Sequence, residues 1–321
     1  MAREIRAMRL CDILFALGSD HAQERVRQHG YVPLVLPDDM QLEQWLSITL
    51  HEVAPDILLL DAPEGFPVSL AAQRVANGKL TVILDDAGPL RRYAHAAYYP
   101  PAPVLDTLDW TDCPATVHSG FEWVALGETF SPRPRIVTSG PVRILLTMGG
   151  SDPQGFTLRA LQWLKSEHLR NLDWRASVIA GPYFALSMQK EIVEFLKTAD
   201  MPIEVITSPP DMGAIMASCD FAVASFGVSA YELACCGVPA AYICLTRQHS
   251  AMADVFEHNG IAINLGVHHE ICDEAAVSSV AALLHKPEQL ENMGQTAAQL
   301  VDGLGAQRIA ADMIRRMEIK I

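Results

Sequence analysis

The feature that most constrains the fold is a regular alternation of short apolar runs and helix-like segments after residue 141. Strands are predicted at residues 142–148, 174–179, 203–206, 221–224 and 241–245. Helices are predicted between and after them, at residues 155–165, 187–198, 212–217, 229–236, 250–258 and from 274 onward. Such alternation implies parallel strands in a doubly wound sheet, with ligands bound at the carboxyl ends of the strands.

The first part of the chain shows a similar but weaker alternation. A helix broken near Gly18 is predicted over residues 8–29, and further helices over 41–53 and 70–77. Strands are predicted at 31–36, 56–61 and 80–86, and the last two end in Asp61, Asp85 and Asp86. The proline-containing stretch 128–141 is the best linker candidate. We therefore expect an α/β protein of two Rossmann-like doubly wound domains facing a cleft, residues 1–137 and 138–321.

Composition limits the classes of partner. The chain has 321 residues, half of them hydrophobic, and a net charge of 24 − 38 = −14, which argues against nucleic acid or an anionic membrane. Seven cysteines without a C-x-x-C pair are typical of reduced core thiols. No signal peptide and no apolar run of the roughly 18 residues that could span a bilayer is present. These features predict a cytoplasmic protein, with its oligomeric state left open.

Two strand–turn–helix segments carry the functional signal. In CDFAVASFGVSAYELACCGVP (219–239) a predicted strand leads through Ser225, Phe226 and Gly227 into a helix, and GGSDP (149–153) does the same after an earlier strand. A helix start presents unpaired N–H groups and the positive end of the helix dipole, which suit a phosphate. Alternatively, Ser229 and Glu232 form only a capping box, S-x-x-E. Two such turns in one domain suggest a diphosphate ligand.

Several other site types are excluded by their missing motifs. The sequence contains no G-x-x-x-x-G-K-[ST], no G-x-G-x-x-G after the first strand, no H-E-x-x-H and no G-x-S-x-G. These absences argue against P-loop nucleotide hydrolases, nicotinamide dehydrogenases, zinc peptidases and the simplest serine hydrolases. His268 and His269 form an isolated pair without further metal-ligand spacing, so no metal and no cofactor is predicted.

The second half resembles the UDP-sugar hydrolases of pseudaminic acid biosynthesis, which release the nucleotide from a UDP-linked 2,4-diacetamido-2,4,6-trideoxyhexose. These in turn resemble the C-terminal domain of the glycosyltransferase that makes lipid II. The matching pieces are ILLTMGGSDP (144–153), VIAGP (178–182), DMGAIMASCDFAVASFGVSAYELACCGVP (211–239), Gln248 with Ala251, and LVDGLGAQRI (300–309). The resemblance implies a glycosyltransferase-B fold and a UDP-sugar ligand.

The resemblance also implies roles for individual residues. The turns would face the diphosphate, Glu232 would accept hydrogen bonds from the ribose hydroxyls, and the Gly181 and 207–212 loops would border uracil. Gln248 would lie near the sugar or phosphates. The implied nucleotide-sugar contacts are Gly150, Ser151, Gly181, Phe226, Gly227, Val228, Ser229, Glu232 and Gln248.

The first half departs from the family. The family begins with a strand and a G-x-G-H-x-x-R turn whose His is the expected catalytic group. Aligning Met8-Arg9 with the end of that motif puts Arg6 at the His position. The strand that should precede the motif is then missing. A reading frame that continues upstream of Met1 would be one explanation of the missing strand and His. The family's D-H-Y reads Asp61-Ala62-Pro63. The catalytic base is therefore unassigned. The substitutes to consider are Asp61, Asp85, Asp86, His21 and His95, with Arg6 and Arg9 as phosphate ligands.

Three hypotheses follow. The leading one is a UDP-sugar hydrolase of this family. The second is a glycosyltransferase that uses a UDP-sugar donor and holds its acceptor in the first domain. The third is a catalytically inactive homologue that only binds a UDP-sugar. A hydrolase needs a base near the anomeric carbon, a transferase needs an acceptor site, and a binding protein needs neither.

Overall fold

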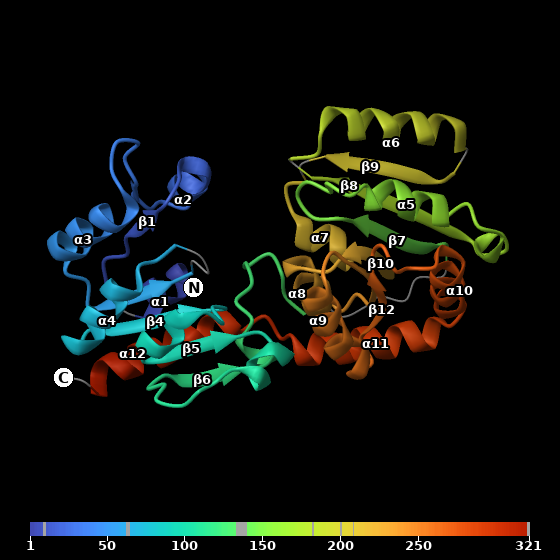
Figure 1. Cartoon of the computed structure of the whole chain (residues 1–321). Coiled ribbons are helices and arrows are strands. Elements are labelled where there is room, and N and C mark those ends of the chain that lie inside the picture. Colours follow the sequence, from blue (N-terminus) through green and yellow to red (C-terminus); the bar gives the residue numbers. More distant parts are fainter. Residues whose placement is uncertain are drawn as a thin grey trace. The chain divides into compact units, whose positions relative to one another are not determined.

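A computed structural model describes residues 1–8, 11–61, 65–132, 140–181, 183–199, 201–207 and 209–319. The chain forms two compact units (Figure 1). Unit 1 comprises Met1–Pro100, Val104–Ala125 and Leu304–Ile321, and unit 2 comprises Pro101–Pro103 and Leu126–Gly303. The predicted boundary after residue 137 lies outside the described residues.

Unit 2 contains a sheet of six parallel strands in the order β12-β11-β10-β7-β8-β9. The strands are β7 (Val142–Thr147), β8 (Trp174–Ala180), β9 (Ile203–Thr207), β10 (Phe221–Ser225), β11 (Ala240–Cys244) and β12 (Ala262–Val267). The helices are α5 (Phe156–Trp163), η5 (Glu167–Leu169), α6 (Leu186–Ala199), α7 (Met212–Ala217), α8 (Val228–Cys235), α9 (Arg247–His258), α10 (Asp273–Leu284) and α11 (Pro287–Leu300). Five of these strands were predicted, and β12 was not.

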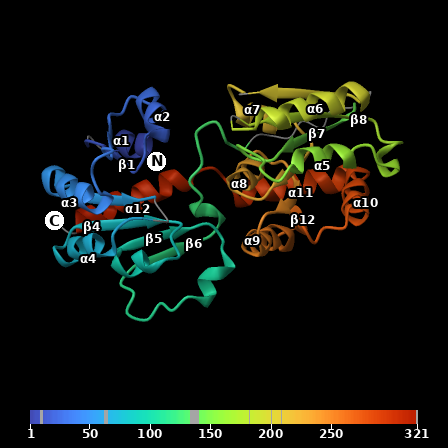
Figure 2. The same cartoon turned by 45° about the horizontal axis from the view of Figure 1, so that its top comes forward.

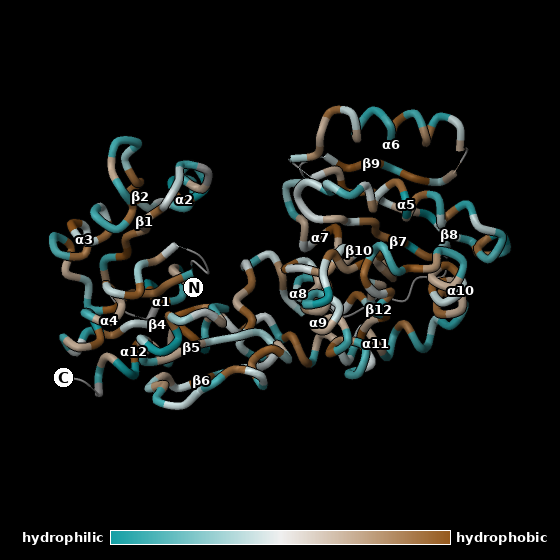
Figure 3. The backbone as a smooth tube through the Cα atoms, in the orientation of Figure 1, coloured by the Kyte–Doolittle hydropathy of each residue, from teal (hydrophilic) through white to brown (hydrophobic). Residues whose placement is uncertain are grey.

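The central strands of unit 2 are apolar because helices cover both faces of the sheet. Every residue of β11 is buried, as are the first four of β10 and the last four of β7. Continuous burial of this kind is the signature of parallel strands. In contrast, hydrophobic and hydrophilic stretches alternate along α6 (Figure 3), which has one face against the core and buries Ile192. The core therefore holds the strand ends, and the loops that follow them, in fixed positions.

Unit 1 has two parallel sheets, β1-β2 and β3-β4-β5-β6. The strands are β1 (Phe15–Leu17), β2 (Pro33–Val35), β3 (Ile57–Leu60), β4 (Leu80–Leu84), β5 (Ala96–Tyr99) and β6 (Thr116–Ser119). The helices are α1 (Ala2–Met8), η1 (Asp20–Ala22), α2 (Gln23–Gln28), α3 (Leu42–Val53), α4 (Val68–Ala76), η2 (Pro89–Tyr93), η3 (Pro103–Thr107), η4 (Phe121–Trp123) and α12 (Gly305–Ile319).

The prediction for residues 8–29 was wrong. Instead of one broken helix, β1 is followed by the short turn η1 and the helix α2, and β1 pairs in parallel with β2. The aromatic and apolar run that ends at Gly18 is too short for a stable helix but long enough for a three-residue strand. The strand that was thought to be missing from the chain is therefore present, and it follows Arg6 instead of preceding it.

The terminal helix α12 packs in unit 1, although the predicted second domain extended to residue 321. Figures 1 and 2 both show α12 running alongside the strands of the larger unit 1 sheet. Ile309 and Met313 of α12 are buried with Leu80, Val82 and Tyr98 of that sheet. This apolar stripe is what attaches the end of the chain to unit 1.

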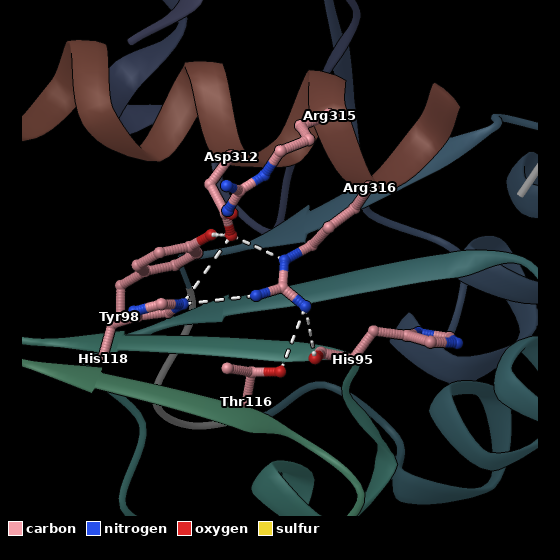
Figure 4. A network of polar contacts seen from close by, with 7 residues as sticks. All are labelled: His95, Tyr98, Thr116, His118, Asp312, Arg315 and Arg316. Carbon is pink, nitrogen blue, oxygen red and sulfur yellow. Dashed lines mark hydrogen bonds and ion pairs between the residues drawn. The ribbon is translucent and has the colours of Figure 1, made fainter. Parts of the chain in front are cut away.

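A polar network reinforces this attachment (Figure 4). The buried Asp312 accepts hydrogen bonds from the Tyr98 hydroxyl and from Arg315, and from Arg316 Nε at 2.6 Å. Arg316 also donates to Thr116 Oγ1 at 3.1 Å and to His118 Nε2 at 3.2 Å. Since a buried carboxylate needs such partners, the network favours one position of α12 on β5 and β6.

The network also shifts pKa values. Burial alone would raise the pKa of Asp312, but the hydrogen bonds from Tyr98, Arg316 and Arg315 outweigh it and lower the pKa to about 2. Burial lowers the pKa of His118; Asp312 opposes this shift, whereas Arg316 and Arg315 add to it. Asp312 is therefore ionised and His118 neutral near pH 7.

Candidate functional site

The strand order of unit 2 contains a topological switch point between β7 and β10. From β7 the chain first builds outward through β8 to β9, and it then returns to place β10 on the other side of β7, followed by β11 and β12. Loops after the two strands at such a reversal diverge and leave a crevice at their carboxyl ends, where open α/β sheets bind ligands. The loops in question are the two predicted phosphate turns, GGSDP after β7 and SFGVS after β10.

The structure brings these two turns together. A Cβ added to Gly149, which has φ +74°, would lie 3.8 Å from Ser225 Oγ at the end of β10. Gly150 and Ser151 follow at the exposed end of the first turn. Because Gly149 adopts a left-handed conformation and has no side chain, the backbone of its turn stays accessible to a ligand.

A third loop joins them from β8. A Cβ on the buried Gly181 would come within 2.4 Å of the Gly150 carbonyl oxygen and 2.5 Å of that of Gly149. The Tyr183 N–H donates to the Gly150 carbonyl at 2.9 Å. Only glycine at position 181 permits this close approach. The predicted contacts Gly150, Ser151 and Gly181 therefore lie in one small region.

The helix that follows the first turn is already capped by an anion from the chain itself. Asp152, 3% exposed, accepts hydrogen bonds from the N–H groups of Phe156 and Thr157 at the start of α5, both at 2.8 Å. From the sequence these N–H groups were expected to face a ligand. The signal for the cap is an Asp shortly before a helix start. An external anion at this turn would meet the backbone of residues 149–151.

The second turn differs because α8 begins without a side-chain cap. Its N-cap residue is Gly227, in extended conformation, and no side chain of the described part of the chain caps it. The neighbouring helices α7 and α9 are capped by Asp211 and Thr246. Ser229 is the second residue of α8 rather than its N-cap, so the capping-box interpretation is wrong. The N–H groups and dipole of α8 therefore favour an external anion.

The remaining predicted residues near this turn have different environments. Glu232 is half-buried on the second turn of α8, Ser229 is half-buried on the first, and Val228 is 68% exposed. Gln248 is exposed on the first turn of α9. All lie on segments that follow β10 or β11 at their carboxyl ends.

Phe226 does not offer a group to a ligand, contrary to the sequence prediction. Its ring is 3% exposed and packs edge-on against Tyr242 and Phe256, with ring centroids 5.3 and 5.4 Å away. Its N–H donates to the Ile243 carbonyl at 3.0 Å. Phe226 instead anchors the turn in the core beneath Gly227.

Unit 1 places three carboxylates at the carboxyl edge of its larger sheet. Asp61 follows β3, and Asp85 and Asp86 follow the adjacent strand β4. Partial desolvation, with added repulsion from Asp61 and Asp86, raises the pKa of Asp85 to about 6, although the residue is exposed. Asp85 also has a left-handed backbone conformation, φ +50°, which is uncommon for a non-glycine residue.

Asp86 supports the turn beside Asp85. It is 4% exposed, its Oδ1 accepts from the Gly88 N–H at 2.6 Å, and its carbonyl accepts from the Tyr99 hydroxyl at 2.7 Å. Its Oδ2 has no hydrogen-bond partner among the described residues. Strain, a raised pKa and a buried carboxylate in one turn are features of functional sites.

The other catalytic candidates are separated by the structure. His95 lies at the opposite, amino-terminal edge, where its Nδ1 accepts from the Thr81 N–H at 3.1 Å, so its predicted catalytic use is wrong. His21 lies in η1, directly after the carboxyl end of β1. Arg6 lies on α1 with its guanidinium 5.5 Å from the Tyr31 ring centroid. Arg9 lies outside the described residues.

Neither a cluster of metal ligands nor a membrane-spanning helix occurs within the described ranges. No three His, Cys, Asp or Glu side chains there are arranged to hold a metal ion. None of the helices described combines the length and apolar character needed to cross a membrane.

Comparisons with known proteins agree with this architecture. No protein-family model matches the sequence. The spore coat polysaccharide biosynthesis protein SpsG of Bacillus subtilis (strain 168) is 25% identical over 306 residues, which cover 94% of this chain and 88% of SpsG.

Solved structures resemble the chain over nearly its whole length. Acinetobacter baumannii MurG aligns with a TM-score of 0.64 and 16% identity, over 98% of this chain and 93% of MurG. The Neisseria meningitidis UDP-GlcNAc 2-epimerase bound to UDP-GlcNAc aligns with a TM-score of 0.62 and 11% identity, over 99% and 94%. The chain has the glycosyltransferase-B fold, with parallel Rossmann-like sheets in both units.

Proposed function

We propose that the chain processes a nucleotide sugar and, within that class, hydrolyses a UDP-sugar with release of UDP. The observation that carries the proposal is the meeting of two glycine-containing turns with the uncapped start of α8 at the switch point of unit 2. This arrangement suits a diphosphate. Similarity to SpsG and to a structure holding UDP-GlcNAc supports the ligand class.

In this proposal unit 2 holds the nucleotide. The backbone of residues 149–151 and the first turn of α8 face the diphosphate. Glu232 accepts hydrogen bonds from the ribose hydroxyls, and Gln248 lies near the sugar or phosphates. Because these donors are fixed before the reaction, they stabilise the negative charge that develops on departing UDP. Replacing Glu232 by Ala is expected to weaken UDP binding, and unchanged binding would contradict the ribose assignment.

The candidates for the proton-transfer group are residues of unit 1. Asp85 is the strongest candidate because its pKa of about 6 leaves it mostly ionised, yet basic enough to accept a proton near neutral pH. As the water oxygen bonds to the anomeric carbon, a general base takes the water proton. The bond from that carbon to the diphosphate oxygen breaks, and its electron pair leaves with UDP. His21 is the alternative, because it follows a strand end as the family's catalytic histidine does.

The proposed sugar is a diacetamido-trideoxyhexose of the kind used in nonulosonic (pseudaminic-type) acid biosynthesis. This choice rests on the matching segments of unit 2, from ILLTMGGSDP to LVDGLGAQRI. It also agrees with the polysaccharide biosynthesis role named for SpsG.

A glycosyltransferase is the second candidate, because solved structures of this fold include glycosyltransferases such as SnogD and SpnP. Their likeness to this chain is of fold alone. In that case an acceptor hydroxyl takes the place of water in the same displacement.

The test is UDP release from purified full-length protein incubated with a panel of UDP-sugars, with and without sugar acceptors. The hydrolase proposal predicts UDP release without acceptor, in amounts equal to the free sugar formed. Release that requires an acceptor would support the transferase. UDP binding without any release would leave the inactive binding homologue, and no UDP binding would overturn the proposed ligand class.

A further inference from the structure

An exposed aromatic side chain stands beside the first phosphate turn. Tyr183, in the loop after β8, is 74% exposed. Single exposed apolar residues are common on protein surfaces and need no explanation by themselves. This ring does need an explanation, because it lies directly against the turn formed by Gly149 and Gly150.

The loop holds Tyr183 in this position through its backbone. The Tyr183 N–H donates to the Gly150 carbonyl at 2.9 Å, and Gly181 packs without a side chain against the same turn. The ring lies so close that a Cβ on Gly150 would be 3.3 Å from Tyr183 Cδ2. Glycine at position 150 therefore leaves room both for a ligand and for the ring.

A second exposed apolar side chain follows three residues later. Leu186, the first residue of α6, is 75% exposed. The segment that follows β8 thus exposes a planar aromatic ring beside the turn and an aliphatic side chain at the start of α6. A charged phosphate gains little from such a surface, whereas the face of a nucleobase stacks on aromatic rings.

We propose that Tyr183 is a specificity residue that stacks on the base of the bound nucleotide while the turn at Gly149–Ser151 contacts its diphosphate. The inference rests on the proposed function, since it needs a nucleotide at the switch point of unit 2. It adds to the position that the resemblance implies for uracil the side chain that would hold the base, and with it the selection of nucleotides over bare diphosphates.

Equilibrium binding of UDP and of inorganic pyrophosphate to full-length protein tests the inference. Variants are Tyr183→Ala, Tyr183→Phe and, as the matched exposed control on the same edge, Leu186→Ala. Stacking on one base contributes about 1–3 kcal/mol, so Tyr183→Ala is expected to weaken UDP binding about 5- to 150-fold. Pyrophosphate binding should not change, Tyr183→Phe should bind UDP like the wild type, and Leu186→Ala should have less effect than Tyr183→Ala.

The outcomes separate the two claims. If wild-type protein does not bind UDP, the proposed function is overturned. If the wild type binds UDP and Tyr183→Ala binds it equally well, the stacking role alone is overturned. Equal losses of UDP and pyrophosphate binding in Tyr183→Ala would also overturn it, because the ring would then shape the turn instead of holding a base.

Discussion

The carboxyl edges of the two units carry opposite chemistry. In unit 2 the loops after β7, β8 and β10 present glycine backbone and the uncapped start of α8. In unit 1 the loops after β3 and β4 present Asp61, Asp85 and Asp86. One edge therefore attracts an anion, whereas the other repels it and holds a carboxylate whose pKa is raised to about 6. The comparison separates binding, which we assign to unit 2, from proton transfer, which we assign to unit 1.

The largest effect is expected at the acidic edge. Asp85→Asn should reduce UDP release about 100- to 10,000-fold, the usual contribution of a general base, and leave UDP binding unchanged. Since the base must be ionised, the wild-type rate should fall as the pH drops through about 6. The pH dependence of turnover in both proteins provides the measurement.

The matched control for this prediction is Asp56→Asn, at the other end of β3, where an exposed carboxylate pairs with Lys79 at 3.6 Å. It should turn over like the wild type. An Asp85→Asn variant that releases UDP at the wild-type rate would exclude Asp85 as the base and favour His21.

The contacts that attach α12 to unit 1 are expected to stabilise unit 1 and not unit 2. Asp312→Asn should destabilise unit 1 by about 3–5 kcal/mol, because Arg316 and Tyr98 lose the carboxylate that satisfies them in a buried site. Chemical unfolding followed by hydrogen exchange can measure the free energy of unfolding of each unit separately. Asp273→Asn in unit 2 is the control: that carboxylate is 55% exposed, so its loss should cost below about 1 kcal/mol. Equal destabilisation by both variants would contradict the role of the network.

A smaller effect is expected in unit 2. Gly181→Ala puts a methyl group against the carbonyls of Gly149 and Gly150, and such overpacking costs about 1–3 kcal/mol. If that strain distorts the turn, UDP affinity should fall about 5- to 150-fold. Asp273→Asn, at an exposed carboxylate elsewhere in unit 2, is the comparison and should bind UDP like the wild type. Calorimetric titration would show the difference, and equal affinities in the two variants would contradict the shared geometry of the loops.

The smallest effect concerns His118. Because its folded pKa lies below the unfolded value of about 6.5, it contributes stability above pH 6.5 that is lost as the pH falls toward the folded pKa. Asp312 also has a lowered pKa, about 2, so its contribution is lost only between about pH 4 and pH 2. His118→Gln should make the stability of unit 1 less dependent on pH as the pH falls from 6.5 toward the folded pKa of His118. An unchanged pH dependence would show that His118 does not titrate in this window.

Much of unit 2 could be predicted from sequence because its strands are continuous apolar runs separated by clear turns. The alternation from β7 to β11 and the two turns at 149–153 and 225–229 were both visible. The order of strands, which makes those turns neighbours, was not, since pairing is a long-range property. Asp152 was missed because its carboxylate is recognised as a cap only once the start of α5 is known.

Unit 1 was harder to predict for physical reasons. The strands β1 and β5 have three and four residues, too few for a periodic signal. The place of α12 depends on Ile309, Met313 and Asp312 meeting strands some 200 residues earlier. The raised pKa of Asp85 likewise depends on Asp61, which follows the adjacent strand. Sequence patterns indicated acidic strand ends but not which carboxyl group would have a raised pKa.

The most direct test of the central claim is hydrogen–deuterium exchange of the full-length protein with and without UDP. We predict slower exchange of amides in peptides that cover residues 149–151 and 227–230, with no slowing in peptides that cover residues 85–88. Protection at the acidic edge of unit 1, with none at the switch point of unit 2, would contradict the assignment of nucleotide binding to unit 2.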